Sequence, residues 1–106
     1  MSFTEMDGYV VTNKETLNGE VFDHTTRIFA AYETAEIRFH RLVDAAFQET
    51  HPKGEMSDDE YADALSDFVS KHVVEHLEVD GISLSLDYEH ENHKIEITLE
   101  TYTEPL

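Results

Sequence analysis

Apolar and polar side chains alternate through two neighbouring segments near the end of the chain, and this alternation constrains the fold most. A period of two indicates β-strands, whose successive side chains point to opposite faces. Joined by a four-residue loop at 90–93, the two segments pair so that every apolar residue faces one side. The facing pairs are Leu84 with Leu99, Leu86 with Ile97, and Tyr88 with Ile95. A slip of one residue would expose all of them, so the sequence predicts a β-hairpin over 82–102.

A helix is predicted over 57–79, immediately before this hairpin. Ser57 and Glu60 have the spacing of a capping box, in which each side chain satisfies a polar group of the other residue. Acidic residues in the first turn also suit the positive end of a helix dipole. The apolar residues then recur at helical spacing: Tyr61, Leu65, Phe68, Val69, Val73 and Leu77.

A second helix is predicted over 20–50, after a turn at Asn18-Gly19. Its apolar positions recur at intervals of three, four or seven residues, and Pro52 and Gly54 follow its end. Unbroken, the segment would extend roughly 46 Å at 1.5 Å per residue, which is long for so small a chain. We therefore expect one of two outcomes: the helix overhangs and pairs with something, or it breaks near residues 20–25.

A lone hairpin is marginal in water, so its apolar face needs a cover, which the two amphipathic helices can supply. The expected architecture is α+β, with two layers: the helices packed on one face of a small antiparallel sheet. Residues 1–106 form one domain in this interpretation. Residues 1–19 are poorly patterned, although residues 9–12 are β-prone and are a candidate N-terminal edge strand.

The charge of the chain limits the classes of partner. There are 24 Asp and Glu residues against seven Lys and Arg, a net charge of −17. Such a field repels nucleic acid and anionic lipid and attracts cationic proteins, so we expect neither direct nucleic-acid binding nor membrane binding. The chain has no Cys, no signal-peptide pattern at its start and no apolar run long enough for a membrane span. We expect a cytoplasmic protein.

One short motif suggests metal chemistry. His72, Glu75 and His76 spell His-x-x-Glu-His, and on a helix the two imidazoles would lie one turn apart. The further carboxylate ligand and the cleft of a zinc peptidase have little room in the 30 residues that remain, so His72 and His76 are only weak candidates for metal ligands. No catalytic residues and no cofactor are expected, because no nucleophile motif or glycine-rich phosphate loop is present.

The acidic residues are unevenly distributed along the chain. Residues 1–54 carry nine acids and five Lys or Arg, a charge of −4, whereas residues 55–106 carry 15 acids and two Lys, a charge of −13. On the predicted 57–79 helix, three Asp stand at successive turns, and the uncovered sheet face is expected to be acidic. The predicted partner-binding residues are Asp58, Asp59, Asp63, Asp67, Glu75, Asp87, Glu89, Glu96 and Glu100.

These observations favour a non-enzymatic acidic binding protein. The first hypothesis is an inhibitor or decoy that occupies the cationic surface of a nucleic-acid-binding enzyme with carboxylates in place of phosphates. Phage-encoded blockers of restriction or CRISPR nucleases and immunity proteins against nuclease toxins share this small, Cys-free, acidic profile; the likeness is one of composition. The alternative is a structural or assembly protein that forms a homodimer or larger homo-oligomer through the long first helix and its aromatic residues.

Overall fold

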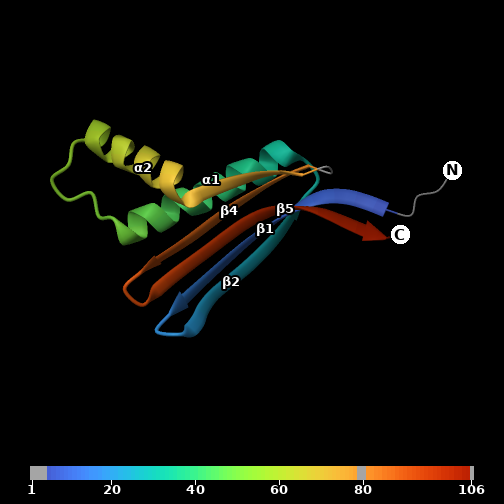
Figure 1. Cartoon of the computed structure of the whole chain (residues 1–106), viewed down its shortest axis with the longest axis horizontal. Helices are drawn as coiled ribbons and strands as arrows, with labels where there is room; N and C mark the ends of the chain where they lie inside the picture. The colour runs from blue at the N-terminus through green and yellow to red at the C-terminus, as the bar shows by residue number, and fades with distance from the viewer. Residues whose placement is uncertain (1–4, 79–80, 106) are drawn as a thin grey trace.

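A computed structural model describes residues 5–78 and 81–105 of the chain, and Figure 1 shows the arrangement of its elements. The described residues form five strands and two helices. In chain order these are β1 (Glu5–Leu17), β2 (Glu20–Phe29), α1 (Tyr32–Thr50), α2 (Asp58–His72), β3 (Val73–Glu78), β4 (Gly81–His90) and β5 (His93–Pro105).

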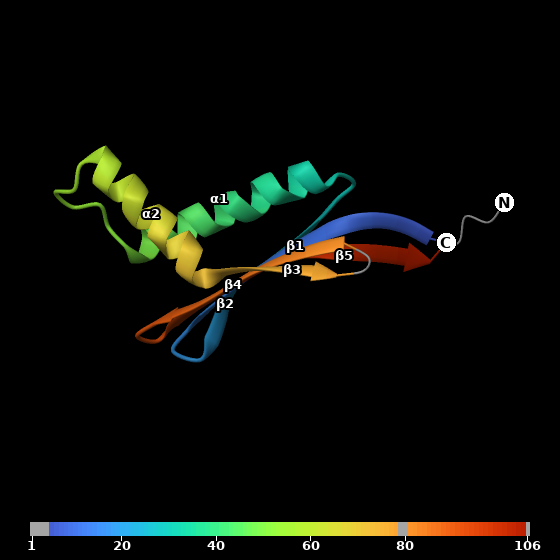
Figure 2. The same cartoon turned by 45° about the horizontal axis from the view of Figure 1, so that its top comes forward.

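The strands form one sheet in the order β2-β1-β5-β4-β3, and all neighbouring strands are antiparallel. The chain leaves the sheet at the end of β2, forms both helices, and re-enters at the opposite edge as β3. Both helices lie on the same side of the sheet (Figure 2). The fold is α+β, as the sequence predicts.

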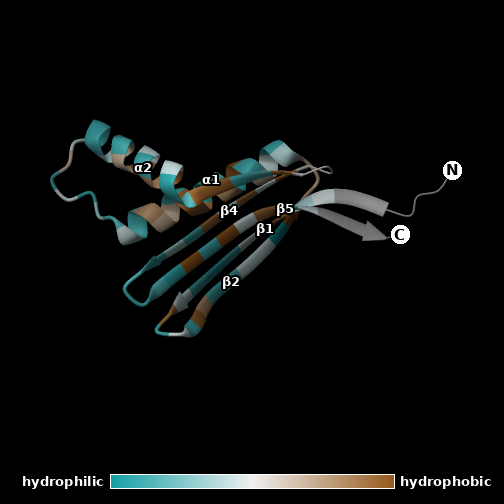
Figure 3. Cartoon of the chain, viewed as in Figure 1, coloured by the Kyte–Doolittle hydropathy of each residue, from teal (hydrophilic) through white to brown (hydrophobic). Residues whose placement is uncertain are grey.

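Strands β4 and β5 form a hairpin with the pairs expected from the alternation. Leu84 lies opposite Leu99, Leu86 opposite Ile97, and Tyr88 opposite Ile95. The alternating bands along these strands are visible in Figure 3. The expected four-residue loop is shorter: His90 and His93 pair with each other, which leaves a two-residue turn at Glu91-Asn92.

The expected N-terminal edge strand is part of the much longer β1, and it lies inside the sheet. β1 pairs with β2 on one side and with β5 on the other. Its residues Tyr9, Val11, Asn13 and Glu15 alternate with residues that face away from the helices, and Val11 is 2% exposed. The poorly patterned segment therefore supplies a central strand.

The prediction of a helix over 20–50 is wrong for its first third. Residues 20–29 form β2, and α1 begins only at Tyr32. Asn18 and Gly19 have φ values of 53° and 84°, which suit the two-residue turns of β-hairpins. Val21, Thr25, Thr26 and Ile28 are β-branched and favour a strand. The break lies a few residues beyond the one considered at 20–25.

The prediction of a helix over 57–79 is wrong from residue 73. Ser57 caps α2 as expected, because its Oγ accepts a hydrogen bond from the amide of Glu60 at 3.1 Å. The helix ends at His72, and Val73–Glu78 continue directly as β3, paired with β4. The β-branched Val73 and Val74 favour a strand once a neighbouring strand edge is available. Residues 79 and 80 lie outside the described residues.

The core lies between α1 and the central strands. Ala35, Phe39, Val43, Ala46 and Phe47 are buried along one stripe of α1. They meet apolar side chains of the sheet that are at most 5% exposed: Val11, Leu84, Leu86, Ile95, Ile97 and Leu99. Within α2 (58–72) the one buried residue is Phe68. α1 therefore supplies most of the cover, whereas α2 contributes one buried side chain and several that are only partly buried.

Candidate functional site

Four of the predicted partner-binding residues lie together on α2. Asp58, Asp59, Asp63 and Asp67 are all exposed. Asp59, Asp63 and Asp67 stand at successive turns, which places neighbours roughly 6 Å apart along the axis. We call these three residues the acidic stripe. Asp58 forms an ion pair with Lys53 and so contributes less free charge.

Of the other five predicted residues, one lies on the helix side of the sheet and four on its uncovered face. Glu75 lies opposite Leu84 on the helix side of β3 and is exposed. The remaining four alternate with the core residues of β4 and β5 and lie on the uncovered face: Asp87, Glu89, Glu96 and Glu100. The structure therefore divides the nine residues between opposite sides of the molecule.

The uncovered sheet face carries the four expected acids, but two Lys residues reduce its net charge. Lys94 Nζ lies 3.6 Å from Glu96 Oε1, and Lys14 of β1 is the cross-strand neighbour of Glu96. A row of hydroxyl side chains crosses the middle of the same face: Thr26, Thr12, Thr98 and Ser85. The face is less strongly acidic than expected because β1 and β2, which were not expected as a central strand and an edge strand, supply neutral and basic residues to it.

The His72–His76 pair does not form the predicted helical chelate. His72 ends α2, where its ring contacts Phe68 and Tyr88 at centroid distances of 4.8 and 5.0 Å. His76 lies on β3, in register with Ser83 on the uncovered face. The helix breaks between the two residues, so the spacing of four no longer places them on one helical face.

A cluster of Glu15, Glu49 and His93 lies on the helix side of the sheet, and the sequence reasoning missed it. One ligand atom from each of the three residues lies within 4.8 Å of the other two. Glu15 Oε1 is 3.5 Å from His93 Nε2, and Glu15 is 9% exposed. His93 Nε2 is buried and has no hydrogen-bond partner in the structure. We call these three side chains the Glu-Glu-His cluster.

Three elements position this cluster. Glu15 is near the end of β1, His93 is the first residue of β5, and Glu49 is in the last turn of α1. The β1–β5 pairing puts Glu15 opposite Ile95 and Leu17 opposite His93. The amide of Asn18 also donates to the carbonyl of Asn92 at 2.9 Å, which ties the two hairpin turns together.

Burial raises the pKa of Glu15 above its ordinary value of 4.5, and the carboxylate of Glu49 raises that pKa further. His93 acts in the opposite direction on the pKa of Glu15, and Asp23 raises it again. The cluster is thus a place where negative charge is crowded and partly desolvated. Its residue types are ligands for Zn²⁺ and related divalent metals.

The sequence contained one signal of this cluster. Along β1, Asn13 and Glu15 occupy inward positions of the same alternation as Tyr9 and Val11. Polar residues at inward positions of a strand indicate a buried polar site, because such groups are costly to bury without partners. The β-prone run at residues 9–12 stops short of Asn13 and Glu15, so this signal is apparent only when the strand extends to residue 17.

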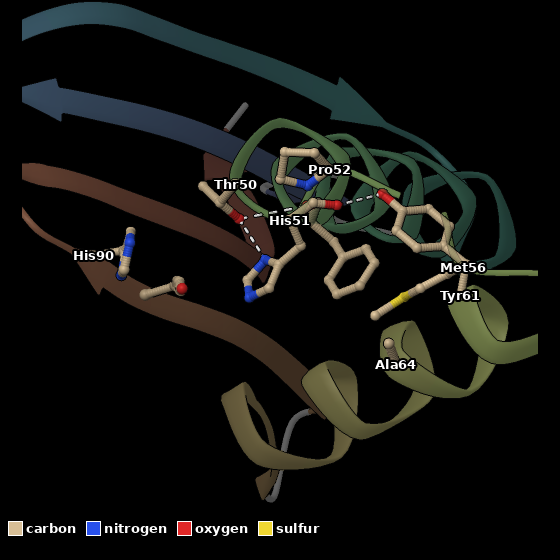
Figure 4. Close-up of a pocket in the computed structure, with 9 residues that line it drawn as sticks. Thr50, His51, Pro52, Met56, Tyr61, Ala64 and His90 are labelled. Atoms are coloured by element: carbon tan, nitrogen blue, oxygen red, sulfur yellow. Dashed lines mark hydrogen bonds between the residues drawn. The ribbon is translucent and has the colours of Figure 1, made fainter. Parts of the chain in front are cut away.

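A cavity of about 370 Å³ lies between the end of α1, the first half of α2 and β4 (Figure 4). Its lining is mostly aromatic and apolar: Phe47, Thr50, His51, Pro52, Met56, Tyr61, Ala64, Tyr88 and His90. The ring of His51 stacks on Phe47 with centroids 4.7 Å apart, and Tyr61 donates to the carbonyl of His51 at 2.6 Å. We call this the aromatic cavity.

The aromatic cavity offers ring faces and few charges. Thr50 Oγ1 and His51 Nδ1 are 2.8 Å apart and hydrogen-bond to each other. A neighbouring hollow shares Phe47 and His51 with the cavity and is also lined by Asp67 of the acidic stripe and by Lys71. Ring faces beside a carboxylate suit a cationic side chain or another flat ring.

No helix among the described residues is both long enough and apolar enough to cross a membrane. The chain matches no protein-family model, no curated protein and no solved structure.

Proposed function

We propose that the protein is a non-catalytic, cytoplasmic binding protein that presents α2 to a basic partner protein. In this proposal, it occupies the partner's cationic nucleic-acid-binding surface and so acts as an inhibitor or decoy. The observation that carries the proposal is the acidic stripe, three exposed Asp at successive turns of one helix. Regularly spaced carboxylates on a rigid element offer a cationic groove the charge that phosphates otherwise supply.

The charge on α2 supports this contact surface over the sheet face. Residues 58–72 carry five acids and one Lys. On the sheet face, by contrast, Lys14 and Lys94 accompany the acids. Charge that is not neutralised by neighbours steers a partner of opposite sign and accelerates association. We therefore assign partner binding to α2 and leave the sheet face outside the contact surface.

The aromatic cavity supplies the second element of the proposed interface. Binding energy in protein interfaces is concentrated in a few anchor side chains that enter well-packed pockets, and Arg is common among them. The cavity borders α2 at Tyr61 and Ala64, and Asp67 lies in the adjoining hollow. We infer that an Arg side chain of the partner stacks in the cavity while neighbouring cations meet the acidic stripe.

Charge reversal on two faces tests the proposal. One variant carries Asp59→Lys, Asp63→Lys and Asp67→Lys; the matched control carries Asp87→Lys, Glu89→Lys and Glu96→Lys, which change the net charge equally. A partner is first captured from lysate at low salt, and its affinity for each variant is then measured between 50 and 300 mM salt (roughly the range over which the Debye length falls from 14 to 6 Å).

We expect the acidic-stripe variant to lose affinity by about tenfold to hundredfold, since three pairs at about 0.5–1 kcal/mol each are replaced by repulsion. Its salt dependence should also flatten, and the protein should no longer compete with nucleic acid for the partner. The control should retain most of its affinity. Equal losses in both variants would mean that only bulk charge matters and would contradict an interface on α2.

Self-association is the second candidate, and a different element now supports it. Phe39 and Phe47 of α1 are buried, so these two of the aromatic residues that suggested pairing through the first helix are already covered. Instead, the edge strand β2 exposes Val21, Phe22 and Ile28 by 50–60%. An uncovered edge can pair with the same edge of a second copy. Light scattering at low micromolar concentration separates the two candidates, because edge pairing requires a dimer.

A further inference from the structure

We propose that Glu15, Glu49 and His93 bind one divalent first-row transition-metal cation, of which Zn²⁺ is the natural probe. The site is separate from the acidic stripe and from the aromatic cavity. It lies where the start of β5, the end of β1 and the last turn of α1 meet. The inference does not depend on the proposed function.

The distances suit a metal of this size. In a tetrahedral site with bonds of about 2.1 Å, two ligand atoms lie about 3.4 Å apart. Glu15 Oε1 and His93 Nε2 are already 3.5 Å apart. The third ligand atom, from Glu49, is within 4.8 Å of both, and the side chain of Glu49 is exposed. A small rotation of this side chain completes a three-residue ligand set with one open position.

The unpaired nitrogen of His93 points to a missing ligand. Buried polar atoms in folded proteins almost always have hydrogen-bond partners, and exceptions require an explanation. His93 Nε2 is buried without a partner, although a carboxylate oxygen lies 3.5 Å away. His93 Nε2 therefore lies close to the Glu15 carboxylate without forming a hydrogen bond to it. A cation between the two atoms would satisfy both, because a neutral imidazole nitrogen and a carboxylate oxygen are both metal ligands.

The surrounding charges favour a cation. Among the residues whose side chains the structure describes (8–77 and 82–101), no Lys or Arg forms an ion pair with Glu15 or Glu49. Asp23 lies opposite Glu15 on β2 and adds a further negative charge. His93 is the one basic group in contact with Glu15. Two carboxylates and a third nearby thus face one imidazole.

The ligand types indicate which cations the site would select. Imidazole suits Zn²⁺, Co²⁺, Ni²⁺ and Fe²⁺, whereas Mg²⁺ and Ca²⁺ prefer oxygen ligands alone. The many exposed acids of this chain are oxygen donors. The Glu-Glu-His cluster should therefore differ from the rest of the surface by preferring a transition metal over Mg²⁺ in excess.

Calorimetry on the chelator-treated full chain tests the site, with ZnSO₄ as titrant in the presence of 5 mM MgCl₂ (roughly a thousandfold excess over the protein, chosen to saturate oxygen-only sites). We expect one equivalent of Zn²⁺ to bind. The variants Glu49→Gln and His93→Gln should each weaken this binding tenfold or more. Two substitutions are the matched controls and should bind as the wild type does. Glu33→Gln changes an exposed Glu in the first turn of the same helix, and His24→Gln changes an exposed His on the uncovered face of β2.

A second measurement on the wild-type chain does not depend on the folding of any variant. Nitrogen-15 NMR of the imidazole groups should show a large shift at Nε2 of His93 when Zn²⁺ is added, at the same one-to-one endpoint. No Zn²⁺ binding, a loss of affinity equal in the control variants, or an unchanged His93 Nε2 resonance would each overturn the proposal. Weak binding at several sites without any His93 shift would identify adventitious binding to the acidic surface.

Discussion

Phe68→Ala is expected to release α2 from the rest of the protein while leaving the sheet folded. Phe68 is the buried residue of α2 and is 5% exposed. Its ring contacts four other rings at centroid distances of 4.8–5.3 Å: Phe47, His51, His72 and Tyr88. The other apolar residues of α2 are only partly buried.

The size of the effect follows from the area that Phe68 buries. A Phe side chain buries on the order of 200 Å², which at about 25 cal/mol per Å² corresponds to about 5 kcal/mol. Phe→Ala substitutions in protein cores lose about 3–5 kcal/mol. An isolated helix of this length is marginal in water, so α2 melts once it is undocked. Once α2 is undocked, the substitution removes no further contact. The fall in the free energy of unfolding of the sheet therefore cannot exceed the free energy with which α2 docks in the wild type.

Native-state hydrogen exchange distinguishes local from global loss. In Phe68→Ala, the amides of α2 should lose about 3–5 kcal/mol of protection, while those of β1 and β5 keep most of theirs. Phe39→Ala is the matched control, because Phe39 is 0% exposed at the centre of α1. That variant should lower protection throughout the chain. If the two variants lower protection in α2 and in the sheet alike, α2 does not unfold as a separate unit.

Two further substitutions test the sheet. In chelated buffer, Glu15→Gln should stabilise the protein at pH 7.5, because the raised pKa of Glu15 means that its ionised form is disfavoured in the folded state. This gain in stability should shrink toward pH 4.5, by at most about 1.4 kcal/mol per pH unit, because the wild-type carboxyl takes up its proton. Urea unfolding at several pH values measures the difference in stability between variant and wild type. A variant less stable than the wild type at pH 7.5 would contradict the expected direction. Gly8→Ala should destabilise the protein by about 1–3 kcal/mol, because the added Cβ would lie 2.9 Å from the carbonyl oxygen of Phe29 and force β1 from β2. An unchanged urea midpoint would show that the strands move apart without cost.

The sequence predicted those elements whose boundaries have a local chemical signal. Ser57 begins α2 because its hydroxyl and the Glu60 amide interact, and that signal is complete within four residues. The β4–β5 register followed from alternation alone. The start of β3 has no such signal: His72 and Val73 are adjacent, without a Gly, Pro or Asn between helix and strand. The apolar residues Val69, Val73 and Leu77 lie four apart and fit a continuing helix. Residues 73–78 form a strand instead because they pair with the otherwise free edge of β4.

Local patterns can indicate only Glu15 as a buried polar residue, not the three-residue Glu-Glu-His cluster. Glu15 and His93 lie far apart in the sequence and meet because β1 pairs with β5. His93 had the sequence environment of a loop residue, but the two-residue turn makes it the first residue of a strand, where its side chain faces the helices. The acidic stripe, in contrast, could be predicted, because the helical spacing of Asp59, Asp63 and Asp67 alone places them at successive turns of one helix.

The pairing of β1 with β5 also determines the order in which this chain can fold during synthesis. The register runs from Glu5 with Pro105 to Leu17 with His93, so the centre of the sheet joins the first and last strands. Closing a loop of this length is slow and entropically costly. On the ribosome, β1 and β2 can form a hairpin early, and α1, which follows directly, can then cover the inner face at Val11. Until β5 emerges, however, the edge of β1 that pairs with β5 has no strand beside it, and the nascent chain exposes that unpaired edge.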